Sequence, residues 1–480
     1  MADARSASGF REEDAEAKWQ IISSSAILMA LTLNVNAEAV RGNEPGEVQM
    51  REQGVKHVTV PGLRLHLRRD DNDNILWINS QKVLMLNATA ADYVEAYIDA
   101  MRSTAEFDQS VVKSKIAEAI EGKYPTVTKE RILSDFDTLY AQIVAIGEDK
   151  CPVYDLGIGQ QVVDVNKLTA PPRVDLALTY RCNNKCSYCY TGGSRKTKEL
   201  DTTQWTQILS KLWEVGVPQV VFTGGEPTLR DDLVQLISRA EEFVTGLVTN
   251  GRLLHKLSKS LNEVSLDYVQ VSIESSSQSV HDEMTGVPNS WTETVDGIKA
   301  AAKEGLNVYT NTTLTKHNAN RFTSTMEFLA SLGVKGIACN SLICSGLGCK
   351  AIEKDGLSEE TLKGILQGAC EKARELKIEF NWYTPTCYKK LNPLDLGLGI
   401  KSCSAAQYNV TIEPDGTVIP CQSLFNYRMG NITKDNWDKI WGNKSARKIR
   451  NHYFISDECR SCDFLETCGG SCPLATGELR

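Results

Sequence analysis

The sequence predicts an α/β protein whose centre is a partial (βα)6 TIM barrel. A small N-terminal strand-plus-helices domain precedes the barrel, and a cysteine-rich extension follows it. Three observations predict this organisation. Strand-like apolar runs alternate with helical segments between residues 172 and 385. Short β-branched runs followed by helical patterns occur before residue 148. Six of the 15 cysteines fall between Cys403 and Cys472, counting both ends.

Composition excludes several classes of protein. The formal net charge of -8 argues against a general nucleic-acid binder, which normally carries a basic surplus. No apolar run approaches the roughly 20 residues that span a bilayer, and the N-terminus lacks a basic start followed by an apolar core. We therefore expect a cytoplasmic protein with no nucleic-acid or membrane partner. In a reduced compartment the cysteines are better explained as metal ligands or core thiols than as disulfides. Buried structural thiols are expected at Cys339, Cys344, Cys349 and Cys370.

The N-terminal third is expected to contain three parts. Residues 1–50 are helix-prone and polar, with no recognisable site. Residues 51–147 form a domain in which strands around the Asp/Asn turn at 70–74 make a hairpin. Asn87 or Thr89 then caps a helix, and two further helical segments follow at about 107–121 and 127–146. Residues 148–171 are expected to be a linker.

The barrel elements come next. Helical segments separate the strand-like runs, so the strands should be parallel. These runs lie at 174–180, 219–225, 245–251, 268–275, 307–314, 336–343 and 378–384. In such a barrel the chemistry belongs at the carboxyl ends of the strands. Three cysteines begin two residues after the first run ends.

This triplet consists of Cys182, Cys186 and Cys189, spaced C-x3-C-x2-C. Three thiolates leave one iron of a [4Fe-4S] cluster without a protein ligand. An open iron can take an exogenous chelating ligand, as a catalytic zinc keeps a position for substrate. The alternative is a zinc site, but structural zinc requires four ligands, and no close partner completes this set.

The triplet, its place after the first strand and the aromatic Tyr188 before the last cysteine resemble the radical S-adenosylmethionine (SAM) superfamily. The resemblance implies that SAM chelates the open iron. It also implies an enzyme that cleaves SAM reductively to a 5'-deoxyadenosyl radical, which abstracts a substrate hydrogen. An electron donor of the flavodoxin or ferredoxin type would be a partner. No residue is assigned as a catalytic acid, base or hydrogen donor, although Cys344 or Cys349 is considered as a donor of hydrogen.

Further positions match the superfamily in order. The resemblance implies SAM binding by Tyr188 and by the GGEP segment, namely Gly224, Gly225, Glu226 and Pro227. It also implies contacts with the ribose or carboxylate of SAM from Ser272, Glu274 and Asn311 at later strand ends. The alternative for these last three is a helix-capping role, since polar residues at strand ends also cap helices.

The tail at 386–480 resembles the SPASM extension of radical SAM maturases. Its cysteines follow the pattern C-x12-G-x4-C and then C-x2-C-x5-C-x3-C. The resemblance implies a first auxiliary [4Fe-4S] cluster on Cys403, Cys421 and Cys472, with Cys387 as a candidate fourth ligand, and a second on Cys459, Cys462 and Cys468. The family's final cysteine is absent, because the sequence ends eight residues after Cys472. Asp457, Glu458, His452, an open iron or a longer natural chain are the alternatives. A zinc ribbon is the alternative for the whole tail.

The front domain resembles, loosely, the small peptide-binding domain of pyrroloquinoline quinone biosynthesis and of ribosomal-peptide maturases. Such a domain adds a leader peptide to a sheet edge as an extra strand. A winged-helix reader or a plain docking surface is the alternative. Arg64, Arg68 and Arg69 could favour an acidic leader, although a solvated hairpin explains them equally well.

Together these patterns predict a radical SAM/SPASM maturase that oxidatively modifies a ribosomally made peptide or protein. The outcome would be a crosslink, a thioether, a carbon-carbon bond or side-chain oxidation. A radical SAM enzyme acting on a small molecule or cofactor precursor is the first alternative. A non-enzymatic iron-sulfur sensor is the second.

Overall fold

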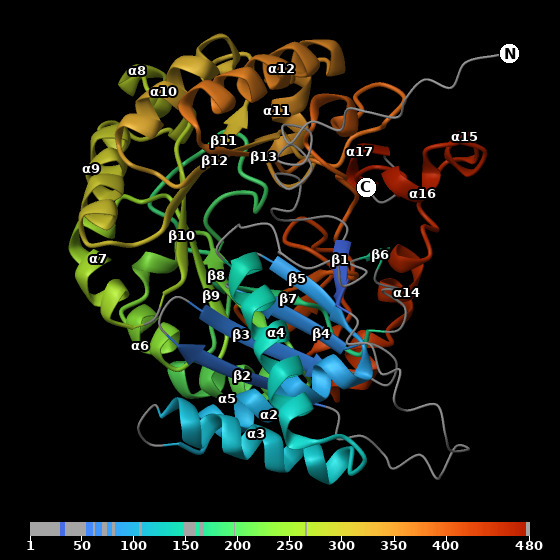
Figure 1. Ribbon diagram of the computed structural model, residues 1–480. Coiled ribbons are helices and arrows are strands. Elements are labelled where there is room, and N and C mark those ends of the chain that lie inside the picture. Colours follow the sequence, from blue (N-terminus) through green and yellow to red (C-terminus); the bar gives the residue numbers. More distant parts are fainter. Residues whose placement is uncertain are drawn as a thin grey trace, which may run out of the picture.

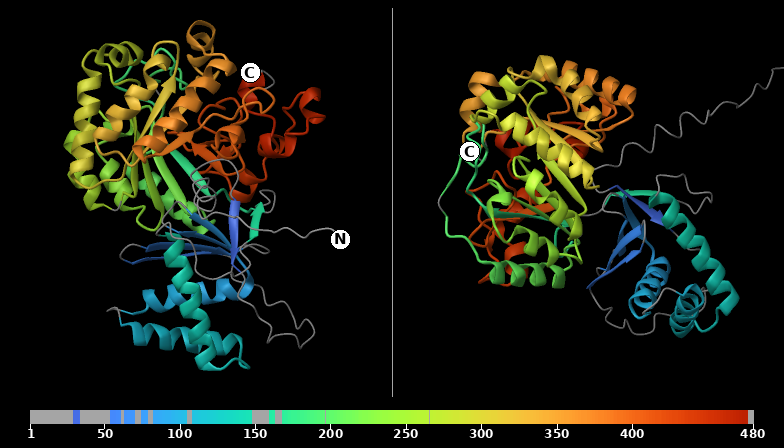
Figure 2. Two further views of the ribbon diagram at one scale, coloured as in Figure 1. Left: turned by 45° about the horizontal axis from the view of Figure 1, so that its top comes forward. Right: turned by 90° about the vertical axis from the view of Figure 1, so that its left-hand side faces the viewer.

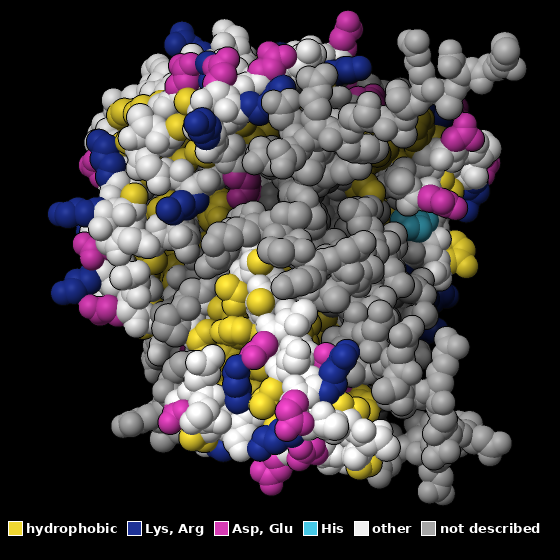
Figure 3. All heavy atoms as spheres, viewed as in Figure 1, with side chains coloured by type: hydrophobic (Ala, Val, Ile, Leu, Met, Phe, Trp, Pro, Cys, Tyr) yellow, Lys and Arg dark blue, Asp and Glu magenta, His cyan; other side chains and the backbone are white. Residues whose placement is uncertain are grey.

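The computed structural model describes most of the chain. The described residues are 29–33, 54–60, 63–69, 74–78, 82–104, 108–147, 159–162, 168–195, 197–264 and 266–476. They form a six-stranded N-terminal sheet and a ten-stranded sheet that contains the barrel (Figure 1). Within these ranges no helix is both long and apolar enough to cross a membrane. On the face drawn in Figure 3, the described acidic and basic side chains are interspersed.

The N-terminal sheet has the strand order β2-β3-β4-β5-β1-β6. Its strands are β1 (Met29–Leu33), β2 (Gly54–Val60), β3 (Leu63–Arg69), β4 (Asn74–Ile78), β5 (Lys82–Leu86) and β6 (Gly159–Val162). The antiparallel pair β3–β4 confirms the expected hairpin. Two expectations change, because β1 is a strand within the segment expected to be helical and β6 is a strand within the expected linker. The two pair with each other, and β1 also pairs in parallel with β5.

Helices α2 (Ala88–Arg102), α3 (Gln109–Lys123) and α4 (Lys129–Gly147) follow the sheet. Asn87 is the N-cap of α2, as expected, and accepts a 2.8 Å hydrogen bond from the N–H of Ala90. These helices cover the side of the sheet that faces away from the barrel (Figure 2). The other face contributes Ile75, Trp77 and Met85 to the hydrophobic core of the barrel. The front domain is therefore packed against the barrel through apolar contact.

Two arginines of β3 fix this arrangement. Arg68 is 1% exposed and donates to the carbonyl oxygen of Ala170 at 2.9 Å. Arg69 forms ion pairs with Asp92 at 2.8 Å and Glu95 at 2.5 Å. The expectation that Arg68 and Arg69 attract an acidic leader is therefore wrong, because both guanidinium groups are buried and paired inside the protein. The side chain of Arg64 lies outside the described residues.

The second sheet has the order β13-β12-β11-β10-β9-β8-β7-β14-β15-β16. Its first seven strands are parallel: β7 (Arg173–Thr179), β8 (Gln219–Gly224), β9 (Val244–Thr249), β10 (Tyr268–Ser272), β11 (Val308–Leu314), β12 (Gly336–Ser341) and β13 (Glu379–Trp382). The helices between them are α5 (Thr202–Glu214), α6 (Leu233–Ser238), α7 (Leu254–Glu263), α8 (Gln278–Thr285), α9 (Ser290–Lys303), α10 (Phe322–Ser331), α11 (Gly348–Asp355) and α12 (Glu359–Leu376). This alternation confirms the α/β class and the partial barrel.

The tail continues the barrel sheet. Strand β14 (Asn409–Ile412) pairs in parallel with β7, and it forms a hairpin with β15 (Thr417–Ile419) and β16 (Gly430–Asn431). Gly416 takes a φ of 83° in the turn between β14 and β15, where the sequence "EPDGTV" predicted one. The remaining helices are α13 (Trp437–Trp441), α14 (Lys444–Arg450), α15 (Asp457–Arg460), α16 (Leu465–Cys468) and α17 (Pro473–Thr476). The cysteine-rich tail thus shares a sheet with the barrel instead of being tethered beside it.

Candidate functional site

A cavity of about 1150 Å³ occupies the barrel. Six cysteines line it: Cys182, Cys186, Cys189, Cys403, Cys421 and Cys472. The lining also includes Arg173, Gln219 and Tyr268 at the amino ends of barrel strands, and Trp77 of the front domain. TIM barrels usually fill this space with side chains. Here one continuous space connects the cysteine triplet, the tail and the edge of the front domain.

The triplet lies on a loop between β7 and α5. The loop is anchored by two hydrogen bonds, from the N–H of Lys185 to Thr285 O at 2.8 Å and from the N–H of Gly192 to Cys189 O at 3.1 Å. All three thiols are partly buried. Burial raises the pKa of Cys182 to about 11, so that a free thiol here stays protonated at neutral pH. Only a bound cation would favour the thiolate, which is the form that ligates metal.

Gly224 and Gly225 bring the end of β8 against this loop. A Cβ on Gly224, whose φ is 137°, would lie 2.2 Å from Thr179 O. A Cβ on Gly225 would lie 2.4 Å from Arg181 O. Both glycines line the cavity. Only glycine allows the backbone of β8 to approach the cysteine loop this closely.

Glu226 has a different place. Its side chain is fully buried and accepts hydrogen bonds from the N–H of Thr228 at 3.0 Å, the hydroxyl of Thr249 at 2.7 Å and the N–H of Asn250 at 2.7 Å. Pro227 begins a 3-10 helix, η1 (Pro227–Leu229). Neither residue is among the described residues that line the cavity. The GGEP segment is therefore divided: the two glycines form the wall, and Glu226 joins the ends of β8 and β9.

Tyr188, Ser272, Glu274 and Asn311, which the sequence made candidates for SAM binding, all line the cavity. Burial raises the pKa of Glu274 to about 7, although hydrogen bonds from Tyr188 and from the N–H of Thr313 oppose this shift. The amide of Asn311 donates to Asn340 at 2.7 Å. Its Oδ1 atom is buried and has no hydrogen-bond partner among the described residues. A buried acceptor of this kind is suited to a ligand that brings a donor.

A chain of polar side chains that the sequence did not reveal runs along the wall of the cavity. The phenol of Tyr190 donates to Gln422 Oε1 at 2.6 Å, and the Gln422 amide donates to Asp175 at 2.8 Å. Asp175 is 1% exposed and also accepts from Arg173 at 2.7 Å. The charge of Asp175 between the apolar residues Val174 and Leu176 of β7 is the signal that could have revealed it. The chain joins the loop of Cys189 to the loop of Cys421.

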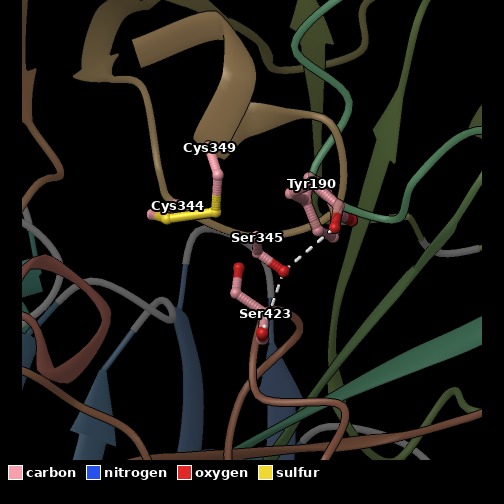
Figure 4. Close-up of a disulfide and its surroundings, with 5 residues drawn as sticks. All are labelled: Tyr190, Cys344, Ser345, Cys349 and Ser423. Atoms are coloured by element: carbon pink, nitrogen blue, oxygen red, sulfur yellow. Dashed lines mark hydrogen bonds between the residues drawn. A yellow bond between two sulfur atoms is a disulfide. The ribbon is translucent and has the colours of Figure 1, made fainter. Parts of the chain in front are cut away.

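A second bridge lies beside it (Figure 4). The hydroxyl of Ser345 is 3.0 Å from Tyr190 O and 3.0 Å from Ser423 O, and its single hydrogen serves one acceptor at a time. Cys344 and Cys349 close the loop around Ser345 as a disulfide, with 4.1 Å between their Cα atoms. The expectation of two separate structural thiols is therefore wrong, because the tight loop brings both thiols together. Neither cysteine is among the described residues lining the cavity, so a hydrogen-donor role gains no support.

The remaining tail cysteines lie away from this space. Cys387, Cys459, Cys462 and Cys468 do not line the cavity, in contrast to Cys403, Cys421 and Cys472. The thiol of Cys468 is 3.3 Å from Thr386 O, so that the segment with Cys387 runs past α16. Burial is the largest cause that raises the pKa of Cys468, and the neighbouring Cys387 adds to it. Among the described residues, no three His, Cys, Asp or Glu side chains converge closely enough to hold a single metal ion.

Comparison with protein-family models decides the class. Residues 176–329 match the radical SAM superfamily, and residues 403–463 match SPASM, an iron-sulfur cluster-binding domain. The chain contains a radical SAM domain followed by a SPASM domain, and it is an enzyme. It therefore carries a [4Fe-4S] cluster with SAM, and auxiliary clusters in the tail. The donor set fits these groups, because each iron of a cubane takes a separate cysteine and six cysteines line the cavity.

Several known proteins resemble this radical SAM enzyme. A Methanosarcina barkeri protein called Fe-coproporphyrin III synthase is 27% identical over 333 residues, which are 62% of this chain and 82% of that protein. The crystal structure of Streptococcus suis SuiB bound to precursor peptide SuiA superposes with a TM-score of 0.61 at 16% identity, covering 87% of this chain and 95% of SuiB. The structure of anSMEcpe with bound AdoMet gives 0.51 at 16% identity, covering 62% and 88%. At these identities the two structures show the fold alone.

Proposed function

We propose that this radical SAM enzyme is a maturase that oxidatively modifies a ribosomally made peptide. Cys182, Cys186 and Cys189 hold the catalytic cluster, and the backbone of Gly224 and Gly225 forms the wall against which SAM lies. When bound, the cluster and SAM supply a 5'-deoxyadenosyl radical that abstracts hydrogen from the substrate. The residues of the chain position SAM and the substrate and exclude water.

The observation that carries the proposal is the shape of the cavity. It reaches from the cysteine triplet at one end of the barrel to Trp77 of the front domain. A peptide held by the front domain therefore has a path to the reacting centre. The fold supports this reading, because SuiB, whose structure contains its precursor peptide, superposes over 87% of this chain.

The polar wall of the cavity suits a peptide. Amide and phenol side chains provide both donors and acceptors, which a peptide backbone requires along its length. The described residues that supply them include Gln219, Tyr268, Gln270, Asn311, Asn340, Tyr383 and Gln422.

The match to Fe-coproporphyrin III synthase favours a second candidate, a porphyrin substrate. A porphyrin with several carboxylates requires cationic partners when it is buried. Among the described residues of the cavity wall, the cations are Arg173 and Lys335. Arg173 is already paired with Asp175, and three further carboxylates line the wall, on Asp267, Glu274 and Glu379. This balance of charge favours the peptide.

The auxiliary cluster on Cys403, Cys421 and Cys472 faces the same cavity. A cluster at the wall can accept an electron from an oxidised product or relay one inward, since its potential is set by ligands and burial. The chain from Tyr190 through Gln422 fixes the distance between the two cysteine loops. We infer that the contact between Tyr190 and Gln422 supports oxidation of the substrate by holding the two cysteine loops at this distance.

The test uses anaerobically reconstituted protein with dithionite and SAM. We expect 5'-deoxyadenosine from the enzyme alone. With a small peptide encoded beside its gene, we expect a product that has lost hydrogen, detected by mass spectrometry. Iron coproporphyrin III is the matched second substrate. Modified porphyrin with unchanged peptide would overturn the peptide assignment, and the Cys182→Ala/Cys186→Ala/Cys189→Ala variant controls for chemistry that does not depend on the cluster.

A further inference from the structure

The second set of tail cysteines consists of Cys459, Cys462 and Cys468, which provide three thiolates. A [4Fe-4S] cluster that serves only electron transfer is normally held by four cysteines. The structure therefore raises the question of which residue beside this set can supply a fourth thiolate.

The segment around Cys387 is packed along this second set. The thiol of Cys468 is 3.3 Å from Thr386 O, directly before Cys387. The ring of Tyr388, directly after it, lies 6.3 Å from the ring of Phe464 between centroids. The hydroxyl of Ser471 contacts Pro385 O at 3.3 Å. Contacts on both sides of Cys387 thus hold it beside the stretch that joins Cys462 and Cys468.

Cys387 is also fixed in its own backbone. Its carbonyl oxygen accepts hydrogen bonds from the N–H groups of Lys390 and Leu391, both at 2.9 Å. The Cys387 side chain is partly buried and does not line the barrel cavity. The first auxiliary set, Cys403, Cys421 and Cys472, lines that cavity in full. The contact between Cys468 and Thr386 thus connects the Cys387 segment with the second set, whereas the sequence-based expectation made Cys387 a candidate ligand of the first set.

We propose that Cys387 is the fourth cysteine of the cluster held by Cys459, Cys462 and Cys468. The proposal rests on the assignment of the tail cysteines to auxiliary clusters. It places the fourth ligand of this cluster upstream of the whole tail pattern. It also leaves the first auxiliary set with three described cysteines, all at the wall of the substrate cavity.

The other candidates are less well placed. The side chain of Asp457 is fully exposed and pairs with Arg460 at 3.7 Å, and Glu458 is exposed. His452 is partly buried, and a Cβ on Gly469 would lie 3.3 Å from its ring. Because His452 has a buried ring nitrogen without a partner among the described residues, it is the competitor that the experiment must exclude.

The test counts iron and sulfide in the full-length chain and does not depend on activity. The background is the variant with Cys182, Cys186 and Cys189 changed to Ala, which should keep about eight irons in two auxiliary clusters. Cys387→Ala is introduced into this background in three ways. It is introduced on its own, together with Cys459→Ala/Cys462→Ala, and together with Cys403→Ala/Cys421→Ala. Cys370→Ala is the matched control, since Cys370 is also partly buried but lies in α12.

We expect Cys387→Ala alone to lower the iron by one to four atoms, and Cys370→Ala to leave it unchanged. When Cys387→Ala is combined with Cys459→Ala/Cys462→Ala, no further iron should be lost, because mutations of one cluster are not additive. When Cys387→Ala is combined with Cys403→Ala/Cys421→Ala, the remaining cluster should be lost or converted to one with fewer irons. The proposal would be overturned if Cys387→Ala removed further iron in combination with Cys459→Ala/Cys462→Ala but none in combination with Cys403→Ala/Cys421→Ala. A loss of no iron in any background would overturn it as well. Iron loss in His452→Ala with none in Cys387→Ala would assign the ligand to His452.

A second measurement applies to the unmutated holoenzyme and does not require that the variants fold. Anaerobic alkylation followed by mass spectrometry reports which thiols are bound to iron. We expect Cys387 to be protected together with Cys459 and Cys462, and all three to become reactive together when a chelator and oxidant remove the iron. Rapid alkylation of Cys387 in the loaded protein would contradict the proposal. A failure to find any peptide substrate would leave these results unaffected.

Discussion

The phenol of Tyr190 donates a 2.6 Å hydrogen bond to Oε1 of Gln422, across 232 residues of sequence. Tyr190 directly follows Cys189, the last cysteine of the triplet proposed to hold the catalytic cluster, and Gln422 directly follows Cys421, a proposed ligand of the first auxiliary cluster. One hydrogen bond therefore joins the two cysteine loops on either side of the cavity. We infer that this hydrogen bond holds the two loops in register.

Tyr190→Phe should separate two steps of the reaction. The change removes one hydrogen bond, which contributes about 1 kcal/mol, and leaves the half-buried Gln422 acceptor without this donor. We expect 5'-deoxyadenosine formation close to that of the wild type, with the ratio of modified peptide to 5'-deoxyadenosine falling about fivefold. Tyr453→Phe, at a tyrosine that is 66% exposed, is the control. An unchanged ratio would show that the contact has no role in coupling.

Gly224→Ala and Gly225→Ala should impair SAM binding. Each new methyl group would meet backbone oxygen at less than 2.5 Å, so the end of β8 must move away from the cysteine loop. We expect SAM affinity, measured by equilibrium dialysis on reconstituted protein, to fall at least about tenfold, or about 1.4 kcal/mol. Gly364→Ala is the control, because Gly364 lies in α12 with open space around it and alanine favours a helix. Unchanged SAM affinity in both barrel variants would remove Gly224 and Gly225 from the site.

The disulfide between Cys344 and Cys349 should be detectable in purified protein and should stabilise its loop. A non-reducing peptide map should show the two cysteines linked. Closing a loop of this size contributes about 2 kcal/mol in the chain-entropy account. We expect Cys344→Ser/Cys349→Ser to increase hydrogen exchange at residues 343–348 and at Cys189–Gly192, which the loop contacts. Exchange that rises only within 343–348 would show that the loop does not support the catalytic triplet.

The ion cluster of the front domain should make its stability depend on pH. Asp92 accepts from Arg69 at 2.8 Å, Lys123 at 2.9 Å and Tyr124 at 2.6 Å. Burial alone would raise the pKa of Asp92, but these partners together hold it below its usual value. The pKa is therefore lower in the folded state, and the stabilisation is present above the unfolded pKa of about 4 and is lost as the pH falls through the folded value.

Asp92→Asn tests this dependence. We expect it to cost about 2 kcal/mol at neutral pH, because hydrogen bonds to a charged group are lost. The difference from the wild type should shrink as the pH falls below about 4. The measurement is the urea concentration at which α2 to α4 lose protection in pulsed hydrogen exchange, compared at each pH. A difference that does not change with pH would contradict the assigned pKa direction.

Local patterns predicted most of the barrel correctly. The spacing of apolar runs sets the strands β7 to β13, and the cysteine triplet falls at a strand end for that reason. Turn and capping residues such as Gly416 and Asn87 were predictable because their conformations depend on neighbours in sequence.

Contacts between distant segments could not be predicted. Nothing near Tyr190 indicates Gln422, and nothing near Cys387 indicates α16, because these pairs are brought together only when the tail joins the barrel sheet through β14. The buried pairing of Arg68 and Arg69 could not be predicted for the same reason, because their partners lie elsewhere in the fold. The division of the GGEP segment was also hidden, since burial of Glu226 depends on the neighbouring β9.

The central claim is that SAM binds directly to a cluster held by Cys182, Cys186 and Cys189. The most direct measurement is electron paramagnetic resonance of the dithionite-reduced, reconstituted protein before and after SAM is added. We predict that SAM shifts one cluster signal in the wild type, and that the Cys182→Ala/Cys186→Ala/Cys189→Ala variant lacks that signal but keeps those of the tail. A wild-type spectrum that SAM leaves unchanged, or a SAM-dependent shift that persists in the variant, would contradict the account.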